Sequence, residues 1–453
     1  MDKLEGVANL NQFNAIPCSN GIKVGNHLTA YTYNSGFKEA HDTYNALSSA
    51  SDGNIYYVLS SDQIHVGGKM YGYNPKTDKT EFLGDLTEIC GEKDQNFIPQ
   101  GKSHVRFFEK NAKLFFSTHV GFYELIEGMD RLPINPPSGY KLYPGGQILS
   151  FDLNAKTFER LALVPNGEGM VSMTMDCDRG HIYGISWPKG NFIHYDTNLK
   201  ELKDLGKTSG NGEAGEPGID FRSLCRSLVV DPDEGTVYFS TASGDIFSYN
   251  PSEGRINKLE NVNLRLDYFG KYDPTRPGSM GYNWREIFWY KSEGVAYGVH
   301  GNSGYLFKFD PRNAKIELVR RITSEPSAKS GMFDQFSYGY LGFQLGPDQK
   351  TIYYLTGGPV YINGKRVEGQ AEIAKGAAKG IENLHLVTYN IPDEKYQDHG
   401  PIFYSNGDRP TYVNSIALGQ QGEVYALARI TENGETRTDL IKIDNPFKRS
   451  IDQ

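Results

Sequence analysis

The chain has few cysteines and no long apolar run, and each absence excludes a class of protein. Its 453 residues include four cysteines, Cys18, Cys90, Cys177 and Cys225, which form neither a CxxC pair nor a zinc-finger spacing. We interpret them as buried or free thiols, and their spacing leaves a disulfide open. No run approaches the roughly 18 apolar residues of a membrane span, so we expect no contact with a membrane interior.

Charge and motifs exclude further classes. The net charge of −8 argues against binding to nucleic acid or to an anionic membrane, although a local basic patch could bind a small anionic ligand. A nucleophile elbow, a P-loop and a Rossmann glycine pattern are missing, as is a grouping of histidines and carboxylates at zinc spacing. We therefore expect no required cofactor, while a structural calcium ion held by backbone carbonyls is compatible with this sequence.

The chain does contain a sevenfold repeat. Seven short apolar runs each carry one aromatic residue, at spacings of 59, 68, 55, 59, 56 and 72 residues. The repeated aromatics are Tyr56, Phe115, Tyr183, Tyr238, Tyr297, Tyr353 and Tyr425. A period of several strands per unit is typical of β-propellers, since one blade alone leaves its faces uncovered. We predict an all-β protein, a seven-bladed β-propeller that spans residues 1–453 as one domain and acts as a monomer.

The third repeat shows the expected plan of a blade. Residues 171–176 alternate like a strand, and a polar turn leads to a second strand over 181–186. A third strand follows over 191–196, and an edge strand is expected near 201–205. Several connections between strands are long, and long loops on a rigid scaffold often carry function.

The repeat also assigns polar residues to one mouth of the ring. The first strand of a blade and the second run in opposite directions, so the start of the first and the end of the second share one rim. Three or four residues after the repeat aromatic stand Thr118, His119, Trp187, His300 and Arg429. Eleven or twelve residues before it stand Asn45, His104, Ser172, Arg226, Arg285 and Asn414. We expect these residues to converge on one funnel.

The rim histidines have two interpretations. His104 and His119 could cap loops, yet they stand on facing strands of one blade, where they could act together on a substrate. His300 and Asn302 lie in a glycine-rich loop and are candidate ligand contacts.

The rim arginines and tryptophan are also open to two interpretations. Arg226 and Arg285 could bind a substrate, or could pair with nearby acids such as Asp220 or Glu286. Trp187 could belong to the core or could provide a flat surface on which a sugar stacks.

Histidine together with arginine favours one chemistry. An arginine binds a carboxylate through two parallel hydrogen bonds. On a uronic acid, neutralisation of that carboxylate acidifies the neighbouring C5 proton, which a neutral histidine can remove. Loss of the substituent at C4 then completes a β-elimination. The paired carboxylates of a glycosidase are not evident on the rim.

Three segments resemble a known family. They are Gln100-Gly101-Lys102-Ser103-His104, Phe116-Ser117-Thr118-His119-Val120-Gly121 and Gly180-His181-Ile182-Tyr183-Gly184-Ile185-Ser186-Trp187-Pro188. They resemble the twin-histidine signature of seven-bladed propeller polysaccharide lyases, namely ulvan lyases and L-rhamnose–α-1,4-D-glucuronate lyases. The resemblance implies cleavage of a glucuronate-containing glycan, of the ulvan type or at the rhamnose–glucuronate linkage of arabinogalactan and gum arabic.

The resemblance also implies roles for residues. One histidine acts as the base, arginines hold the uronate carboxylate, and a tyrosine assists as acid or base. Carried over to this chain, the implied residues are His104 and His119 as the pair and Arg226 and Arg285 as the clamps, with Arg222 as a replacement for Arg226.

The family's tyrosine has no clear counterpart. The rim position where we would place it holds Trp187, so we assign the role to Tyr338, with Tyr282 and Tyr340 as substitutes from other blades.

Two alternatives stay open. A related propeller group has been viewed as rhamnosidases with a lone histidine on a different face, for which His41 is the candidate here. A non-catalytic glycan-binding propeller is the other alternative. The expected partner in each case is a polysaccharide or oligosaccharide, acidic for the lyase. We predict a secreted or periplasmic location, although no signal peptide is visible at the start of the chain.

Overall fold

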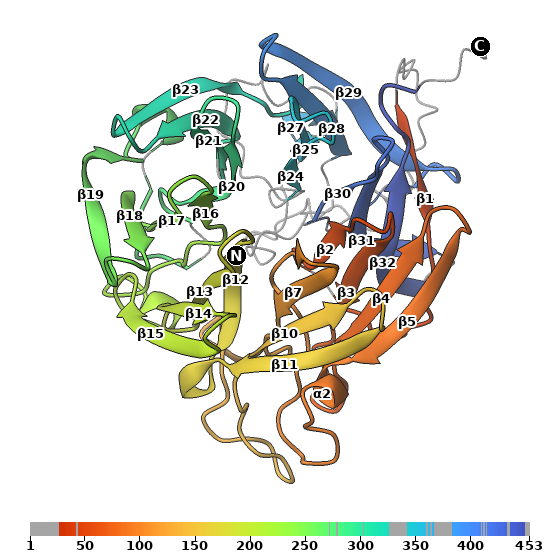
Figure 1. The fold of residues 1–453 in the computed structure, drawn as a ribbon. Helices are drawn as coiled ribbons and strands as arrows, with labels where there is room; N and C mark the ends of the chain where they lie inside the picture. Colours follow the sequence, from red (N-terminus) through yellow and green to blue (C-terminus); the bar gives the residue numbers. More distant parts are fainter. Residues whose placement is uncertain are drawn as a thin grey trace, which may run out of the picture.

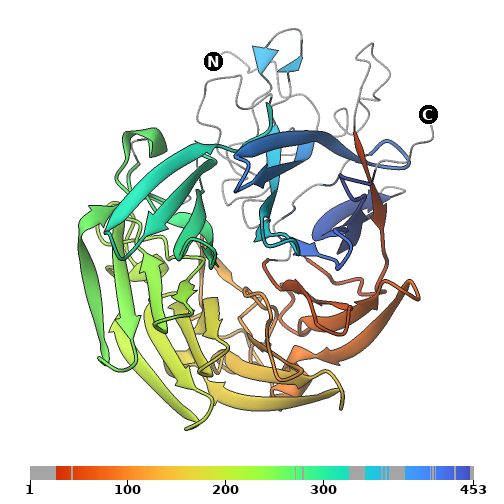
Figure 2. The ribbon, with the colours of Figure 1, turned by 45° about the horizontal axis from the view of Figure 1, so that its top comes forward.

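The strands form seven four-stranded antiparallel blades arranged in a ring (Figures 1 and 2). The computed structural model describes residues 27–448 apart from 42–43, 271, 278–279, 302, 326–341, 359–360, 363–364, 367–382, 409, 411–412, 414 and 433–434. The predicted all-β, seven-bladed propeller is therefore confirmed, while a single domain over residues 1–453 and the monomeric state stay predictions.

The first four blades follow one another along the chain. Blade 1 contains β2 (Leu47–Ser49), β3 (Ile55–Leu59), β4 (Lys69–Asn74) and β5 (Lys79–Asp85). Blade 2 contains β6 (Phe108–Lys110), β7 (Lys113–Ser117), β10 (Gln147–Asp152) and β11 (Thr157–Leu163). Blade 3 contains β12 (Gly169–Asp176), β13 (His181–Trp187), β14 (Asn191–Asp196) and β15 (Glu201–Lys207), close to the predicted ranges. Blade 4 contains β16 (Val229–Asp231), β17 (Thr236–Ser240), β18 (Asp245–Asn250) and β19 (Arg255–Asn263).

The last three blades complete the ring. Blade 5 contains β20 (Trp284–Tyr290), β21 (Val295–His300), β22 (Tyr305–Asp310) and β23 (Lys315–Arg321). Blade 6 contains β24 (Phe343–Leu345), β25 (Thr351–Gly358), β28 (Asn383–Asn390) and β29 (Lys395–Tyr404). Blade 7 contains β30 (Ala417–Leu418), β31 (Val424–Glu432), β32 (Glu435–Ile443) and β1 (Leu28–Thr32).

Short elements interrupt this plan. They are α2 (Leu86–Ile89), the hairpin strands β8 (Glu124–Ile126) and β9 (Met129–Arg131), the hairpin strands β26 (Tyr361–Ile362) and β27 (Lys365–Arg366), and the 3₁₀ turns η1 (Pro165–Gly167), η2 (Gly212–Ala214) and η3 (Asp267–Phe269). Among the described residues no helix is long and apolar enough to cross a membrane. The described cysteines Cys90, Cys177 and Cys225 are free thiols.

Four of the seven repeated aromatics, Tyr56, Tyr183, Tyr238 and Tyr425, contact an aromatic ring of the neighbouring blade. Each of the seven lies in the second strand of its blade and is buried. The ring of Tyr183 in blade 3 lies 5.9 Å from Tyr249 in the third strand of blade 4. Tyr425 of blade 7 lies 5.8 Å from Tyr73 of blade 1, so the same contact also closes the ring. Aromatic pairs of this kind stabilise an interface beyond the area that they bury, which explains why the aromatic recurs.

Strand β1, the first in the described part of the chain, completes the last blade. Residues of β1 pair antiparallel with β32, and they also pair parallel with β29 at the outer edge of blade 6 (Figure 1). Segments more than 370 residues apart therefore share one sheet, in which Leu28 pairs with Ile402 and Ala30 with Ile443. The hydrogen bonds of β1 hold the ring closed.

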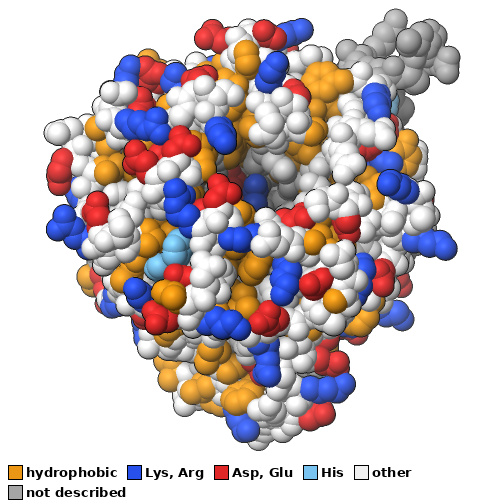
Figure 3. Space-filling model, in the orientation of Figure 1, with side chains coloured by type: hydrophobic (Ala, Val, Ile, Leu, Met, Phe, Trp, Pro, Cys, Tyr) orange, Lys and Arg blue, Asp and Glu red, His pale blue; other side chains and the backbone are white. Residues whose placement is uncertain are grey.

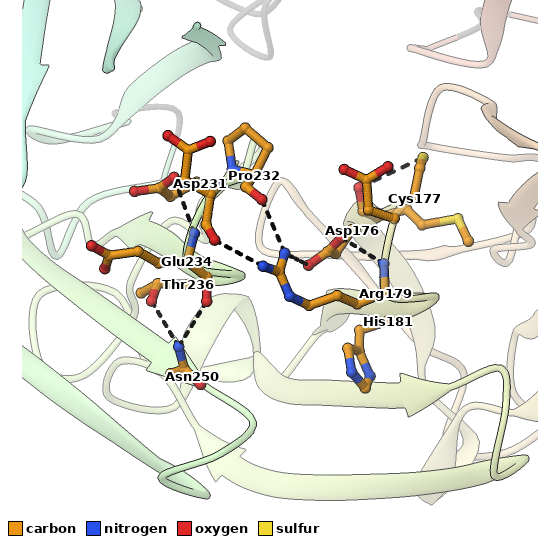
Figure 4. Close-up of polar contacts among 12 residues, drawn as sticks. Asp176, Cys177, Arg179, His181, Asp231, Pro232, Glu234, Thr236 and Asn250 are labelled. Atoms are coloured by element: carbon orange, nitrogen blue, oxygen red, sulfur yellow. Dashed lines mark hydrogen bonds and ion pairs between the residues drawn. The ribbon is translucent and has the colours of Figure 1, made fainter.

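The rim where the first strand of a blade turns into the second is occupied by scaffold contacts. Figure 4 shows Arg179 of blade 3 bound to Asp176 of its own turn, at 3.0 Å, and to the carbonyl of Pro232 in blade 4, at 3.0 Å. Arg179 also donates to the carbonyl of Asp233, and Arg312 of blade 5 reaches the carboxylate of Asp233 from the other side. Arg179 and Arg312 thus bind the turn of blade 4 from the two neighbouring blades.

Two glycines let blades 1 and 2 approach each other beside the opposite rim. A Cβ added to Gly121 would overlap the carbonyl oxygen of Ser61, and a Cβ added to Gly101 would lie 2.6 Å from the same atom. The amide of Ser61 donates to the carbonyl of Gly101 at 2.8 Å. The glycines of both twin-histidine segments are therefore required by packing, because backbone meets backbone there.

We expect Gly121→Ala to lower the free energy of unfolding by about 2–4 kcal/mol, since the inserted methyl group would force two blades apart. Urea denaturation followed by circular dichroism measures the loss. Gly254→Ala is the matched control, because its Cβ would meet no atom within 4 Å and its positive φ of 67° costs only about 1 kcal/mol. Equal losses in the two variants would contradict the packing argument.

Candidate active site

His104 and His119 lie side by side at one mouth of the ring. His119 lies two residues after the end of β7, the second strand of blade 2, and its backbone forms a two-way hydrogen-bonded bridge with Lys102. His104 stands two residues after Lys102, so the bridge brings the two rings together. Their centroids are 4.7 Å apart and their planes differ by 40°.

The hydrogen bonds of His119 fix which nitrogen carries its proton. Nδ1 lies 2.9 Å from the carbonyl oxygen of Val120, which can only accept, so Nδ1 donates. Nε2 is then the nitrogen with the basic lone pair, and it is buried with no hydrogen-bond partner among the described residues. His119 therefore presents a preset basic nitrogen inside the site.

Two tyrosines and a lysine surround the histidine pair. Tyr44 of blade 1 stacks on His104 with ring centroids 3.9 Å apart, and the Tyr123 hydroxyl lies 3.4 Å from Nδ1 of His119. The Lys102 ammonium lies 4.4 Å from the ring centroid of each tyrosine. Lys102 is 4% exposed, so its charge acts on the site with little screening by water.

Burial and positive charge keep both histidines neutral. Burial lowers the pKa of His104 well below 6.5, and the neighbouring His119, Lys102, Arg226 and Arg285 lower it further. Burial also lowers the pKa of His119, with Lys102 as the next cause. A neutral imidazole is the form that can accept a proton, so both rings are in the basic form at pH 7.

The pH dependence of activity follows from these shifts. The base is lost only when it becomes protonated, so the acid limb of the pH–rate profile should lie below pH 6.5. We expect Lys102→Met to move this limb upward by about one pH unit, because one of the charges that oppose protonation is removed. Steady-state rates between pH 4 and 8 measure the limb. Lys110→Met, on the opposite rim, should leave it unchanged, and an unmoved limb in Lys102→Met would contradict the electrostatic argument.

Arg226 and Trp187 lie beside the histidines and share one partner. Arg226 Nη2 donates to Oε1 of Glu213 at 2.5 Å, and Trp187 Nε1 donates to Oε2 of the same carboxylate at 2.9 Å. The rings of Trp187 and His119 are 5.3 Å apart. Of the two interpretations of Arg226, pairing with a local acid is observed, but the acid is Glu213 and not Asp220.

Arg285 approaches the site from blade 5. It is 6% exposed, and its Nη1 lies 2.9 Å from the sulfur of Met280. Its charge lowers the pKa of His104, so it lies within electrostatic range of that histidine. His104, His119, Trp187, Arg226 and Arg285 thus belong to one rim, as the repeat predicts.

Other predicted residues lie elsewhere or outside the described part. Arg222 donates to the carbonyls of its own loop at Ile219 and Phe221. His300 is fully buried and stacks on Phe269 at 4.1 Å, and burial lowers its pKa to about 3. His41 is exposed on blade 1, 3.6 Å from Asp62. Tyr338, Tyr340, Asn302 and Asn414 lie outside the described residues.

A cavity of about 210 Å³ opens beneath the pair in the central channel. His104 and Arg226 belong to its wall, together with Glu286 of blade 5. Burial raises the pKa of Glu286 to about 7. Three side chains from other blades bind this carboxylate: Asn45, Arg106 and Ser227. On the face drawn in Figure 3, the centre of the ring is hollowed and both acidic and basic side chains surround the opening.

Four residues of the site were not predicted, namely Tyr44, Lys102, Tyr123 and Glu213. Tyr44 stands twelve residues before Tyr56, which is a rim position of the repeat, so a sequence signal for it existed. Lys102 stands thirteen residues before Phe115 and Tyr123 stands eight residues after it, and neither spacing is a rim position of the repeat. Glu213 lies in the connection between β15 and β16, outside the strand positions that the repeat aligns, so the repeat could not place it. The described residues contain no group of three or more His, Cys, Asp or Glu side chains placed to hold a metal, and calcium bound by carbonyls stays a prediction.

Comparisons with known proteins agree with the fold. No protein-family model and no curated protein matches the chain. A chain of the mitotic checkpoint complex has a TM-score of 0.50 at 11% identity, over 99% of both chains. A catalytically inactive virginiamycin B lyase from Staphylococcus aureus, solved with quinupristin, has a TM-score of 0.50 at 8% identity, over 92% of this chain and 99% of that one. At these identities the similarity shows a β-propeller and carries no information on activity.

Proposed function

We propose that the protein is a polysaccharide lyase that cleaves a glucuronate-containing glycan by β-elimination. One observation carries the proposal: two neutral histidines lie beside an arginine at a single mouth of the ring. A base and a carboxylate-binding cation are the two groups that this elimination requires. The twin-histidine segments, which resemble those of propeller lyases, support the same reaction.

In the proposed mechanism Arg226 binds the uronate carboxylate and stabilises the negative charge that develops on it. His104 removes the C5 proton, since it is only partly buried and belongs to the cavity wall. The electron pair of the C5–H bond forms the C4–C5 double bond while the bond from C4 to the glycosidic oxygen breaks. The departing oxygen takes a proton from Tyr44, whose ring stacks on His104. The products are an unsaturated uronate and a new hydroxyl end, with no cofactor consumed.

His119 supports His104 and does not itself take the C5 proton. Its proton is held on Nδ1 by the Val120 carbonyl, and its ring lies between His104 and Trp187. A positive charge on His119 would make His104 a weaker base. Because His119 is neutral, it does not oppose the transfer of the C5 proton to His104. We therefore assign His119 to orientation of the base, with Arg285 as a second source of positive charge near the carboxylate.

The substrate class follows from the family resemblance. We propose ulvan or the rhamnose–glucuronate linkage of arabinogalactan side chains, and a secreted or periplasmic location. The test is a scan of uronate glycans, with near-ultraviolet absorbance and mass spectrometry of the products. An unsaturated uronate is expected. Free rhamnose without a new double bond would indicate a hydrolase, and binding without turnover would indicate a glycan-binding propeller; either result overturns the proposal.

A further inference from the structure

The carboxylate of Glu213 occupies the position where a substrate carboxylate would be expected. Its Oε1 accepts hydrogen bonds from Arg226 Nη2 at 2.5 Å and from the Leu224 amide at 3.1 Å. Its Oε2 accepts from Trp187 Nε1 at 2.9 Å. Arg226 and Trp187 are groups of blades 4 and 3 beside the histidine pair, so the protein's own carboxylate accepts a hydrogen bond from each of them.

The Arg226–Glu213 pair is largely shielded from solvent. The side chains of Arg226 and Glu213 are 17% and 16% exposed, so water screens their attraction only in part. Arg226 gives Nη2 to Oε1 of Glu213 and Nη1 to the carbonyl of Leu224, at 3.4 Å. A substrate carboxylate that binds Nη2 and the Trp187 indole must therefore displace Glu213.

The backbone around Glu213 is held in place independently of its side chain. The amides of Glu213 and Ala214 both donate to the carbonyl of Pro188, at 2.8 and 3.2 Å. Arg131 of the β8–β9 hairpin donates to the carbonyls of Glu213 and Gly215. Because these bonds are made by the main chain of η2, the carboxylate can rotate away without unfolding of its loop.

We propose that Glu213 is a specificity-determining residue that holds the carboxylate subsite on Arg226 until an acidic sugar displaces it. This inference rests on the proposed function, because it takes Arg226 as the uronate clamp. When a uronate replaces Glu213, the guanidinium keeps a negative partner. A neutral sugar would instead leave a partly buried guanidinium without a counter-charge, which is unfavourable. The exchange thus selects substrates that carry a carboxylate.

Binding of D-glucuronate and of uncharged D-glucose, measured by isothermal titration calorimetry, tests the proposal. Glu213→Gln keeps the shape of the side chain and removes its charge, so it should bind D-glucuronate about tenfold more tightly than the wild type and leave D-glucose unchanged. Glu216→Gln is the matched control, because it removes the same charge from an exposed position three residues along the same loop. Glu213→Asp, which withdraws the carboxylate, should change affinity in the same direction and serves if the glutamine variant does not fold.

Each outcome decides the question. Weaker, equal or absent glucuronate binding by a folded Glu213 variant overturns the proposal, because Glu213 would then position Arg226 and not compete for it. Arg226→Gln introduced into the Glu213→Gln protein should abolish the gain. A gain in binding together with no unsaturated product in the glycan scan would support the carboxylate subsite while it refutes the lyase, so the two proposals can fail separately.

Discussion

His104→Ala is expected to lower kcat of the lyase reaction by about 10³-fold, because the variant lacks the group that removes the C5 proton. The ring of His104 contacts Tyr44 and His119 at the mouth and belongs to none of the hydrophobic core clusters, so the fold should persist. The initial rate of the near-ultraviolet absorbance increase measures kcat. A far-ultraviolet circular dichroism spectrum and a melting curve like those of the wild type show that the protein is folded.

Two other histidines serve as controls for this prediction. His65 is exposed and has no role in the site, so His65→Ala should retain full activity. His41→Ala tests the hydrolase alternative. If the protein were that hydrolase, His41→Ala would lose activity and His104→Ala would retain it. A folded His104→Ala protein that retains activity within a few-fold would refute the assignment of the base.

Arg226→Met is expected to lower kcat/KM by about 10³-fold, since it removes the charge that acidifies the C5 proton as well as the contact that binds the carboxylate. Arg226→Lys should recover a part of this loss, because it restores the charge without the two parallel hydrogen bonds. Kinetics on a defined uronate oligosaccharide, compared with its methyl ester, measure the effect. The variant should discriminate little between acid and ester, whereas the wild type should prefer the acid.

Arg222→Gln tests the alternative clamp. The guanidinium of Arg222 donates to carbonyls of its own loop, at 2.7 Å for Phe221, so its loss should change kcat/KM by less than about fivefold. A larger effect at Arg222 than at Arg226 would transfer the role of the clamp to Arg222.

The sevenfold plan could be predicted because each blade solves the same packing problem. An aromatic in the second strand contacts an aromatic of the next blade, as Tyr238 contacts Phe309 at 5.5 Å. Because this packing recurs around the ring, an aromatic recurs at the same position in the sequence. The strand ranges of blade 3 follow from the alternation of its residues. The pairing of β1 with β32 was not predicted, since nothing in a five-residue strand identifies a partner at the other end of the chain.

The candidate site was predictable where its residues stand in phase with the repeat. His104, His119, Arg226 and Arg285 share one rim because equal phase places residues at equal height in a blade. Tyr44 also stands in phase with the repeat, twelve residues before Tyr56, and its stacking on His104 identifies it as part of the site.

The sequence by itself determined the architecture and the level along the ring axis at which each polar residue lies. The reason is that every strand has the same rise per residue and equivalent strands run in the same direction in every blade. Only the tertiary structure decided the electrostatics: which acid meets Arg226, where the Lys102 ammonium lies, and which nitrogen of His119 is basic. Glu213 and Lys102 stand outside the positions that the repeat aligns, and the Nδ1 proton of His119 is held by a carbonyl of its own loop. A repeat cannot encode a contact that is made only once.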